Sequence, residues 1–86
     1  MRFTYDDRAD ALYALLREDA PVARSIVIDD DRVLDVDERG EPVGIEVLGA
    51  SKGVRLTDLV DRFGLGEYRE SLRNLEADRF HSAELV

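Results

Sequence analysis

The apolar residues of this chain change their spacing near its middle, and this change limits the folds that are possible. In residues 1–50 apolar side chains mostly recur at every second position, as in "RVLDVD" and "PVGIEVL". Between residues 56 and 80 they recur at every third or fourth position, as in "LTDLVDRFG". A period of two is typical of half-buried strands, and a period of about 3.6 is typical of amphipathic helices. We therefore expect a group of strands followed by helices, which is an α+β organisation.

Short polar segments divide the first part of the chain into pieces of strand length. They are "DDRAD" at 6–10, "EDAP" at 18–21, "DDD" at 29–31 and "ERGE" at 38–41. Because antiparallel neighbours need only short connections, this pattern predicts a small antiparallel β-meander of four to five strands. Residues 11–17, "ALYALLR", fit two structures. Alanine and leucine alone favour a helix, whereas the alternation also fits a strand that is buried on both faces.

The second part of the chain predicts a C-terminal helical arm of one or two helices. "GASKG" at 49–53 forms a joint, Thr57 fits a helix N-cap, and Gly64 fits the end of that helix. The arm carries an apolar stripe that is available to pack on the chain's own sheet or on a second subunit. We take this stripe as the expected interaction surface: Leu59, Phe63, Tyr68, Leu72 and Leu75.

The length of 86 residues predicts a single domain. Its parts are the meander at 1–50, the arm at 54–80 and a tail at 81–86. A domain of this size buries only about 60–65% of its unfolded surface, so its core is modest. Assembly into a homodimer or a higher oligomer is a simple way to bury more, and we expect the chain to associate with itself.

The charge of the chain bears on its partners. The net charge is −8, and residues 1–50 hold thirteen acidic and six basic residues. Binding to nucleic acid requires clustered cations, so we expect no nucleic-acid partner. An acidic surface can attract a basic protein partner, although acidic charge also serves to keep a small domain soluble.

Membrane insertion and export are not expected. The sequence has no apolar run near the ~18 residues of a membrane span. Its N-terminus, "MRFTYDDRAD", lacks the apolar core of a signal peptide. There is no cysteine, which excludes disulfides and thiolate metal sites. These features are consistent with a cytoplasmic protein.

The segment "DVDERGEPVGIE" at 35–46 matches much of a calcium-loop signature, with acids and glycine at the expected spacing. Arg39 places a cation where the loop needs an oxygen ligand, and Pro42 has no backbone N–H to donate. The flanking segments alternate like strands, so the segment predicts a hairpin whose outward face is acidic. A divalent metal or a small ligand on this face is the alternative, with three candidate residues: Asp35, Asp37 and Glu46.

No arrangement typical of an enzyme is found in the sequence. His81 is the only histidine, no serine lies in a Gly-x-Ser-x-Gly elbow, and no phosphate-binding loop is present. The acids at 29–31 fall in a predicted solvated turn, without the apolar surroundings or fixed partner that a catalytic carboxylate needs. We therefore expect a non-enzymatic protein that uses no cofactor.

Residues 3–51 resemble the bacterial and archaeal family called domain of unknown function 2283. The resemblance rests on "YDDRADALYALL" near the start and on "VDERGEPVGIEVLGAS" near the end of this region. It implies a small β-rich domain and carries no catalytic or binding residues to this chain. Members are often encoded beside small toxin-like proteins, which suggests an antitoxin-like role by association.

The leading hypothesis from the sequence is a non-enzymatic protein–protein interaction module, with an antitoxin-like role as one form of it. Three features support this hypothesis: the core is small, the sheet has open edges that need cover, and the arm is amphipathic. Ligand or metal binding on the acidic sheet face is the rival hypothesis.

Overall fold

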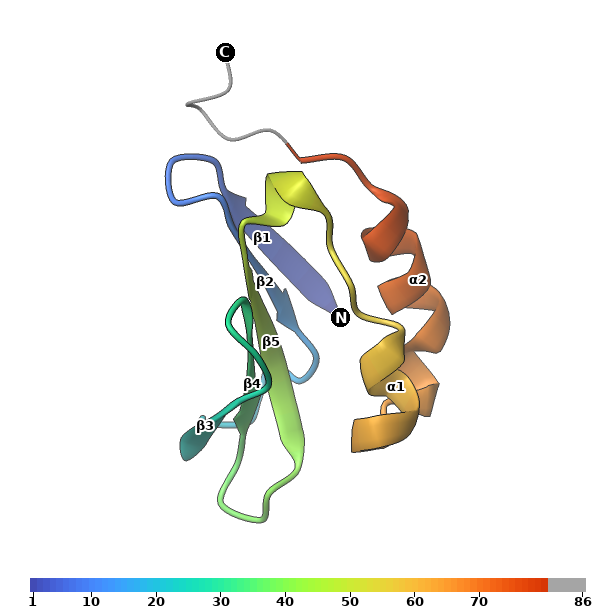
Figure 1. Cartoon of the computed structure of the whole chain (residues 1–86). Coiled ribbons are helices and arrows are strands. Elements are labelled where there is room, and N and C mark those ends of the chain that lie inside the picture. Colours follow the sequence, from blue (N-terminus) through green and yellow to red (C-terminus); the bar gives the residue numbers. More distant parts are fainter. Residues whose placement is uncertain (81–86) are drawn as a thin grey trace.

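The computed structural model describes residues 1–80 and contains five strands followed by helices (Figure 1). The strands are β1 (Arg2–Asp6), β2 (Ala11–Leu15), β3 (Arg24–Val27), β4 (Arg32–Val36) and β5 (Pro42–Leu48). Two α-helices follow, α1 (Asp58–Phe63) and α2 (Arg69–Ala77), and short 3-10 turns lie at Ala50–Lys52 and Gly66–Tyr68. The expected α+β organisation, with an antiparallel sheet and a C-terminal helical arm, is confirmed. The expected tail at 81–86, with His81, lies outside the described residues.

Residues 11–17, which fitted either a helix or a strand, contain strand β2. Its side chains alternate, with Leu12 and Ala14 fully buried and Tyr13 half-buried on the other face. The strand is paired on both sides, to β1 and to β5. The hydrogen bonds of two neighbouring strands therefore outweigh the local helix preference of alanine and leucine.

The strand order refines the expected meander. All pairs are antiparallel, and the order is β1-β2-β5-β4-β3. Only β3, β4 and β5 follow one another as in a meander, because β5 lies between β2 and β4. With seven residues, β5 is the longest strand, and three consecutive residues of it are buried. β5 pairs with β2 on one side and with β4 on the other, which places it at the centre of the sheet and leaves β1 and β3 at the edges.

The helices cover one face of the sheet, which we call the inner face (Figure 1). Leucine and valine side chains of the helical arm join those of β2, β4 and β5 in one core. Phe80, beyond α2, packs on the inner face of β1, where its ring centroid lies 6.1 Å from that of Phe3 and 4.9 Å from that of Tyr5. The opposite face of the sheet is the outer face, and no described helix covers it.

The apolar stripe of the arm packs on the chain's own sheet, which was one of its two expected positions. Leu59 and Leu72 are fully buried and Leu75 is almost so. Phe63 and Tyr68 are half-buried against the same core. The three leucines are therefore not exposed to a second subunit while the helices are docked, and the expected interaction surface needs correction for them.

Gly44 allows a tyrosine to lie across the central strand. Tyr13 pairs with Glu46 in the register of β2 and β5, and its ring extends diagonally over Gly44. A Cβ atom at Gly44 would collide with the ring and the hydroxyl of Tyr13. The missing side chain of this glycine thus opens the path by which Tyr13 reaches β4.

We expect Gly44→Ala to lower the free energy of unfolding by about 1–3 kcal/mol, because the added methyl group displaces a packed ring. Urea unfolding measures this loss. Gly66→Ala is the matched control, since a Cβ atom there meets no atom within 4 Å and the backbone is not left-handed. Equal effects of the two substitutions would contradict the role given to Gly44.

Candidate functional site

Asp10 joins the two ends of the β-sheet region. Its carboxylate accepts hydrogen bonds from the Tyr5 hydroxyl (2.7 Å), the Ser51 N–H (2.9 Å) and the Ser51 hydroxyl (2.6 Å). Burial acts to raise the pKa of Asp10, but the bonds from Ser51 and Tyr5 outweigh it and leave the pKa below the ordinary value. Asp10 has a left-handed backbone with φ of 52°, a conformation that aspartate tolerates better than most residues. The three side chains satisfy one another, which indicates a structural role.

A second network crosses the outer face of the sheet. Asp35 on β4 accepts hydrogen bonds from the Tyr13 hydroxyl (2.9 Å) and from the Ser25 hydroxyl (2.6 Å). Burial and the bond to Asp35 raise the pKa of Tyr13 to about 12, so this hydroxyl stays protonated and donates. The network connects β2 to β4 over Gly44, and β4 to β3 through Ser25.

Asp37 closes the turn between β4 and β5. It accepts hydrogen bonds from the N–H groups of Arg39 and Glu41, each at 2.9 Å, and an ion pair from Arg17 at 2.6 Å. The Arg17 bond and these N–H groups lower the pKa of Asp37 to about 2. This is the hairpin that the sequence predicts for the calcium-like segment, with Gly40 at a φ of 82° in its turn.

The three candidate metal ligands are thus held in separate surroundings. Asp35 is bonded to hydroxyl groups, Asp37 is bonded to Arg17, and Glu46 lies opposite Tyr13 and Val33 in the strand register. In residues 1–80 no group of three or more acidic or histidine side chains is arranged to hold a metal ion. The geometry therefore does not bring the predicted ligands together.

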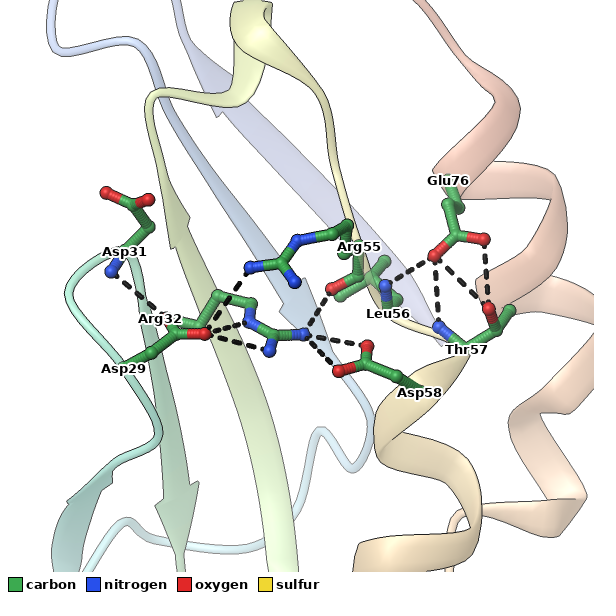
Figure 2. Close-up of polar contacts among 8 residues, drawn as sticks. All are labelled: Asp29, Asp31, Arg32, Arg55, Leu56, Thr57, Asp58 and Glu76. Atoms are coloured by element: carbon green, nitrogen blue, oxygen red, sulfur yellow. Dashed lines mark hydrogen bonds and ion pairs between the residues drawn. The ribbon is translucent and has the colours of Figure 1, made fainter.

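Among residues 1–80, Arg32 is the most buried charged residue. Its side chain is only 5% exposed. Figure 2 shows its guanidinium between the sheet and the helices, bonded to both oxygens of Asp58 (2.7 and 2.9 Å), to Asp29 (2.8 and 2.9 Å) and to the Arg55 carbonyl (2.9 Å). The sequence reading placed Asp29 in a solvated turn and missed this contact. A signal was present, because Arg32 occupies an inward position of β4, two residues before Leu34.

Glu76 on α2 binds the start of α1 (Figure 2). It accepts the N–H of Leu56 (2.7 Å), the N–H of Thr57 (3.1 Å) and the hydroxyl of Thr57 (3.0 Å). Thr57 precedes α1, as predicted, but its hydroxyl makes no cap bond to its own helix. Glu76 supplies the acceptor from another helix, and this ties α2 to α1.

A hollow of about 350 Å³ lies between the β4–β5 turn and the junction of the helices. Both signs of charge surround it, from Arg17, Arg39, Glu41 and Glu67. Ligand sites of this size normally combine apolar walls with a few convergent polar groups. This mixed rim does not indicate one class of ligand.

The open edge of β3 is the remaining candidate. All four residues of β3 are exposed, and Val27 is 73% exposed. Ile26, on the other face of the strand, and Val22, just before it, are also exposed, and β3 is paired on one side only, with β4. Such an edge presents free N–H and C=O groups and is a template for pairing with another chain. The sequence did not identify it, because the edge position follows from the insertion of β5 between β2 and β4.

No helix among residues 1–80 is both long and apolar enough to cross a membrane.

We expect Glu76→Ala to lower the free energy of unfolding by about 1–3 kcal/mol, because two backbone N–H groups lose their acceptor. Chemical unfolding followed by circular dichroism measures the change. Glu70→Ala is the control, since it removes the same charge from an exposed position of α2. If both variants lost equal stability, charge rather than the acceptor would explain the result.

Asp37 predicts a pH dependence. Because its pKa in the fold is lowered from 3.8 to about 2, the carboxylate stabilises the fold above pH 3.8 and loses this contribution as the pH falls through about 2. We expect Asp37→Asn to be less stable than the unsubstituted chain at neutral pH, with the difference shrinking toward pH 2. Unfolding curves over this range test it, with the neighbouring exposed Glu38→Gln as the control. A difference that is constant with pH would contradict the role of the ionised carboxylate.

The comparisons with known proteins agree with the motifs described above. No curated protein and no solved structure matches the chain. A family model described as "Protein of unknown function (DUF2283)" matches residues 2–51, which is more than half of the chain and spans the strands, Asp10 and Ser51. The chain belongs to the DUF2283 family of proteins of unknown function.

Proposed function

We propose that the chain is a non-enzymatic protein–protein interaction module that binds an extended polypeptide segment along β3. The observation that carries this proposal is the open β3 edge, with Val27 at 73% exposure. Strand addition to a sheet edge is a common mode of peptide recognition, in which the backbone gives affinity and alternate side chains give specificity. The antitoxin-like role is one case of this proposal, with the added strand supplied by a toxin.

The polar networks support a binding role rather than a catalytic one. Asp10, Asp35 and Asp37 each accept hydrogen bonds from neighbours of the same chain, and Arg32 is held by two carboxylates. Groups engaged in this way position the strands. The rival, a metal or small ligand at Asp35, Asp37 and Glu46, has weaker support because binding would first have to break these bonds.

The charge of the chain bears on the partner. With a net charge of −8, the surface attracts a basic protein and speeds its encounter. Specific binding still requires pairing with the strand edge.

A photocrosslinking amino acid at Val27 of the full chain, produced in its native cell, tests the proposal. We expect a defined crosslinked product with a polypeptide, because strand addition places a backbone beside this side chain. The same group at Arg73, an exposed residue of α2, is the matched control and is expected to give no defined product.

A second variant separates strand pairing from mere proximity. The Ile28 N–H donates to the Arg32 carbonyl of β4, and bonded pairs alternate along an antiparallel ladder, so the Ser25 N–H faces the open edge. Ser25→Pro removes this N–H at a position where proline is tolerated. Ser25→Ala is its control, because both substitutions also remove the hydroxyl that bonds Asp35. We expect Ser25→Pro to abolish the product from position 27. A product that is unchanged by the proline, or that forms equally from position 73, would overturn the proposal.

A further inference from the structure

We propose that the outer face of the sheet docks a helix of another protein, and that a lysine or arginine on the apolar side of this helix meets Glu46. The surface is a face of the sheet and not the β3 edge, so the inference goes beyond the proposed function. It follows from the side chains that the strands place on this face and from the position of one carboxylate among them.

Strand β2 has the composition of a strand that is covered on both faces. Its sequence is ALYAL, and Leu12 and Ala14 point to the inner face. Ala11, Tyr13 and Leu15 point to the outer face, and none of them is charged. A sheet face that meets only water normally carries polar side chains. The single chain therefore covers one apolar face of this strand and leaves the other open.

The strand register brings further apolar side chains to the same face. Val33 on β4 and Val27 on β3 stand in one row with Tyr13 across the sheet, and Leu48 on β5 stands beside Ala11. Val27 is 73% and Leu48 42% exposed. Contiguous exposed apolar surface is typical of protein interaction sites.

A hollow of about 340 Å³ gives this face a seat for an apolar side chain. It lies at β1 and β2 and is lined by Arg2, Phe3, Thr4, Tyr13 and Leu15. The charge of Arg2 is paired with that of Glu18, and the other lining residues are uncharged. An apolar side chain of a partner therefore fits the hollow better than a charged one.

Glu46 lies at the centre of the outer face. It is on the central strand β5, opposite Tyr13 on one side and Val33 on the other. Within residues 1–80 it is half-buried and forms no ion pair. By contrast, Asp35 on the same face is bonded to two hydroxyl groups. Glu46 is therefore a carboxylate with which a partner can still pair.

The position of Glu46 selects the chemistry of what covers the face. An occupant that is wholly apolar would bury an unpaired carboxylate, which costs free energy. A lysine or arginine removes this cost, and its attraction to Glu46 strengthens as water is excluded. The net charge of −8 favours the approach of such a partner.

The geometry of a sheet face favours a helix over a single added strand. The backbone groups of a strand need partners, and a sheet face offers none, because its own backbone groups bond within the plane of the sheet. A helix satisfies its backbone internally and packs through its side chains, as the chain's own arm does on the inner face. The cation then lies among the residues of the helix that contact Leu15 and Leu48.

A photocrosslinking amino acid at Leu48 of the full chain, produced in its native cell, tests the inference. We expect a crosslinked peptide, read by mass spectrometry, that comes from another protein and carries a lysine or arginine among apolar residues at helical spacing. Glu46→Lys is expected to lower the yield of this product about tenfold, because it sets like charges against each other. Exchanging the identified cation of the partner for glutamate should restore the yield with Glu46→Lys.

Two controls accompany this variant. Glu70→Lys makes the same change in net charge at an exposed position of α2 and should leave the yield unchanged. Circular dichroism verifies that each variant is folded, and Glu46→Gln, a milder change, replaces Glu46→Lys if the latter does not fold. The inference would be overturned by the absence of a product at position 48, by a product that Glu46→Lys leaves unchanged, or by a crosslinked peptide that lacks a cation. A crosslinked peptide from a second copy of this chain would also overturn it.

Ser25→Pro separates this inference from the proposed function. It is expected to abolish the product from position 27 and to leave the product from position 48. A product at position 27 with none at position 48 would remove the outer face and leave the β3 edge in place, and the reverse result would remove the edge alone. A product at position 48 that Ser25→Pro abolishes would assign both contacts to the edge and overturn the inference.

Discussion

The buried guanidinium of Arg32 is the interaction on which the two-layer arrangement depends. A cation with 5% exposure is tolerated only when carboxylates and carbonyls replace its water, and here Asp29, Asp58 and the Arg55 carbonyl do so. Asp29 and Asp58 are 35% and 50% exposed, so solvent screens part of each pair, but removing either carboxylate would leave the buried guanidinium short of acceptors. Apolar packing alone would allow the helical arm several positions on the sheet. The directional bonds from Arg32 to Asp58 and Arg55 select the observed one.

The two helices then behave as one docked unit. Glu76 on α2 satisfies the N–H groups at the start of α1, and Phe80 beyond α2 packs on β1. The arm is thus anchored near the centre of the sheet and at β1. Strand β3 receives no such cover, and its four residues remain exposed. Four of the five residues of β1 are also exposed, so the two edges differ mainly in the cover that Tyr5 receives from Phe80.

Local patterns in the sequence predicted the parts of the fold that neighbouring residues decide. The inward positions of the β4–β5 hairpin, including Leu34 and Ile45, are buried as the alternation indicated. The strand order could not be predicted from local patterns, because it depends on which distant strands pair with β5. The roles of Arg32 and Glu76 were missed for a similar reason, since Asp58 lies 26 residues from Arg32 and Leu56 lies 20 residues from Glu76. Alternation shows that Arg32 points inward, but not which carboxylate meets it.

The family match ends at residue 51, yet the core of this domain does not. Leu56, Leu59, Leu72 and other buried residues of the arm complete it from outside the matched region. The matched strands therefore form a scaffold with one apolar face, and in this chain the element that covers this face lies outside the matched region. A relative that shares the strands but lacks this arm must shield the same face with a different segment or with another molecule.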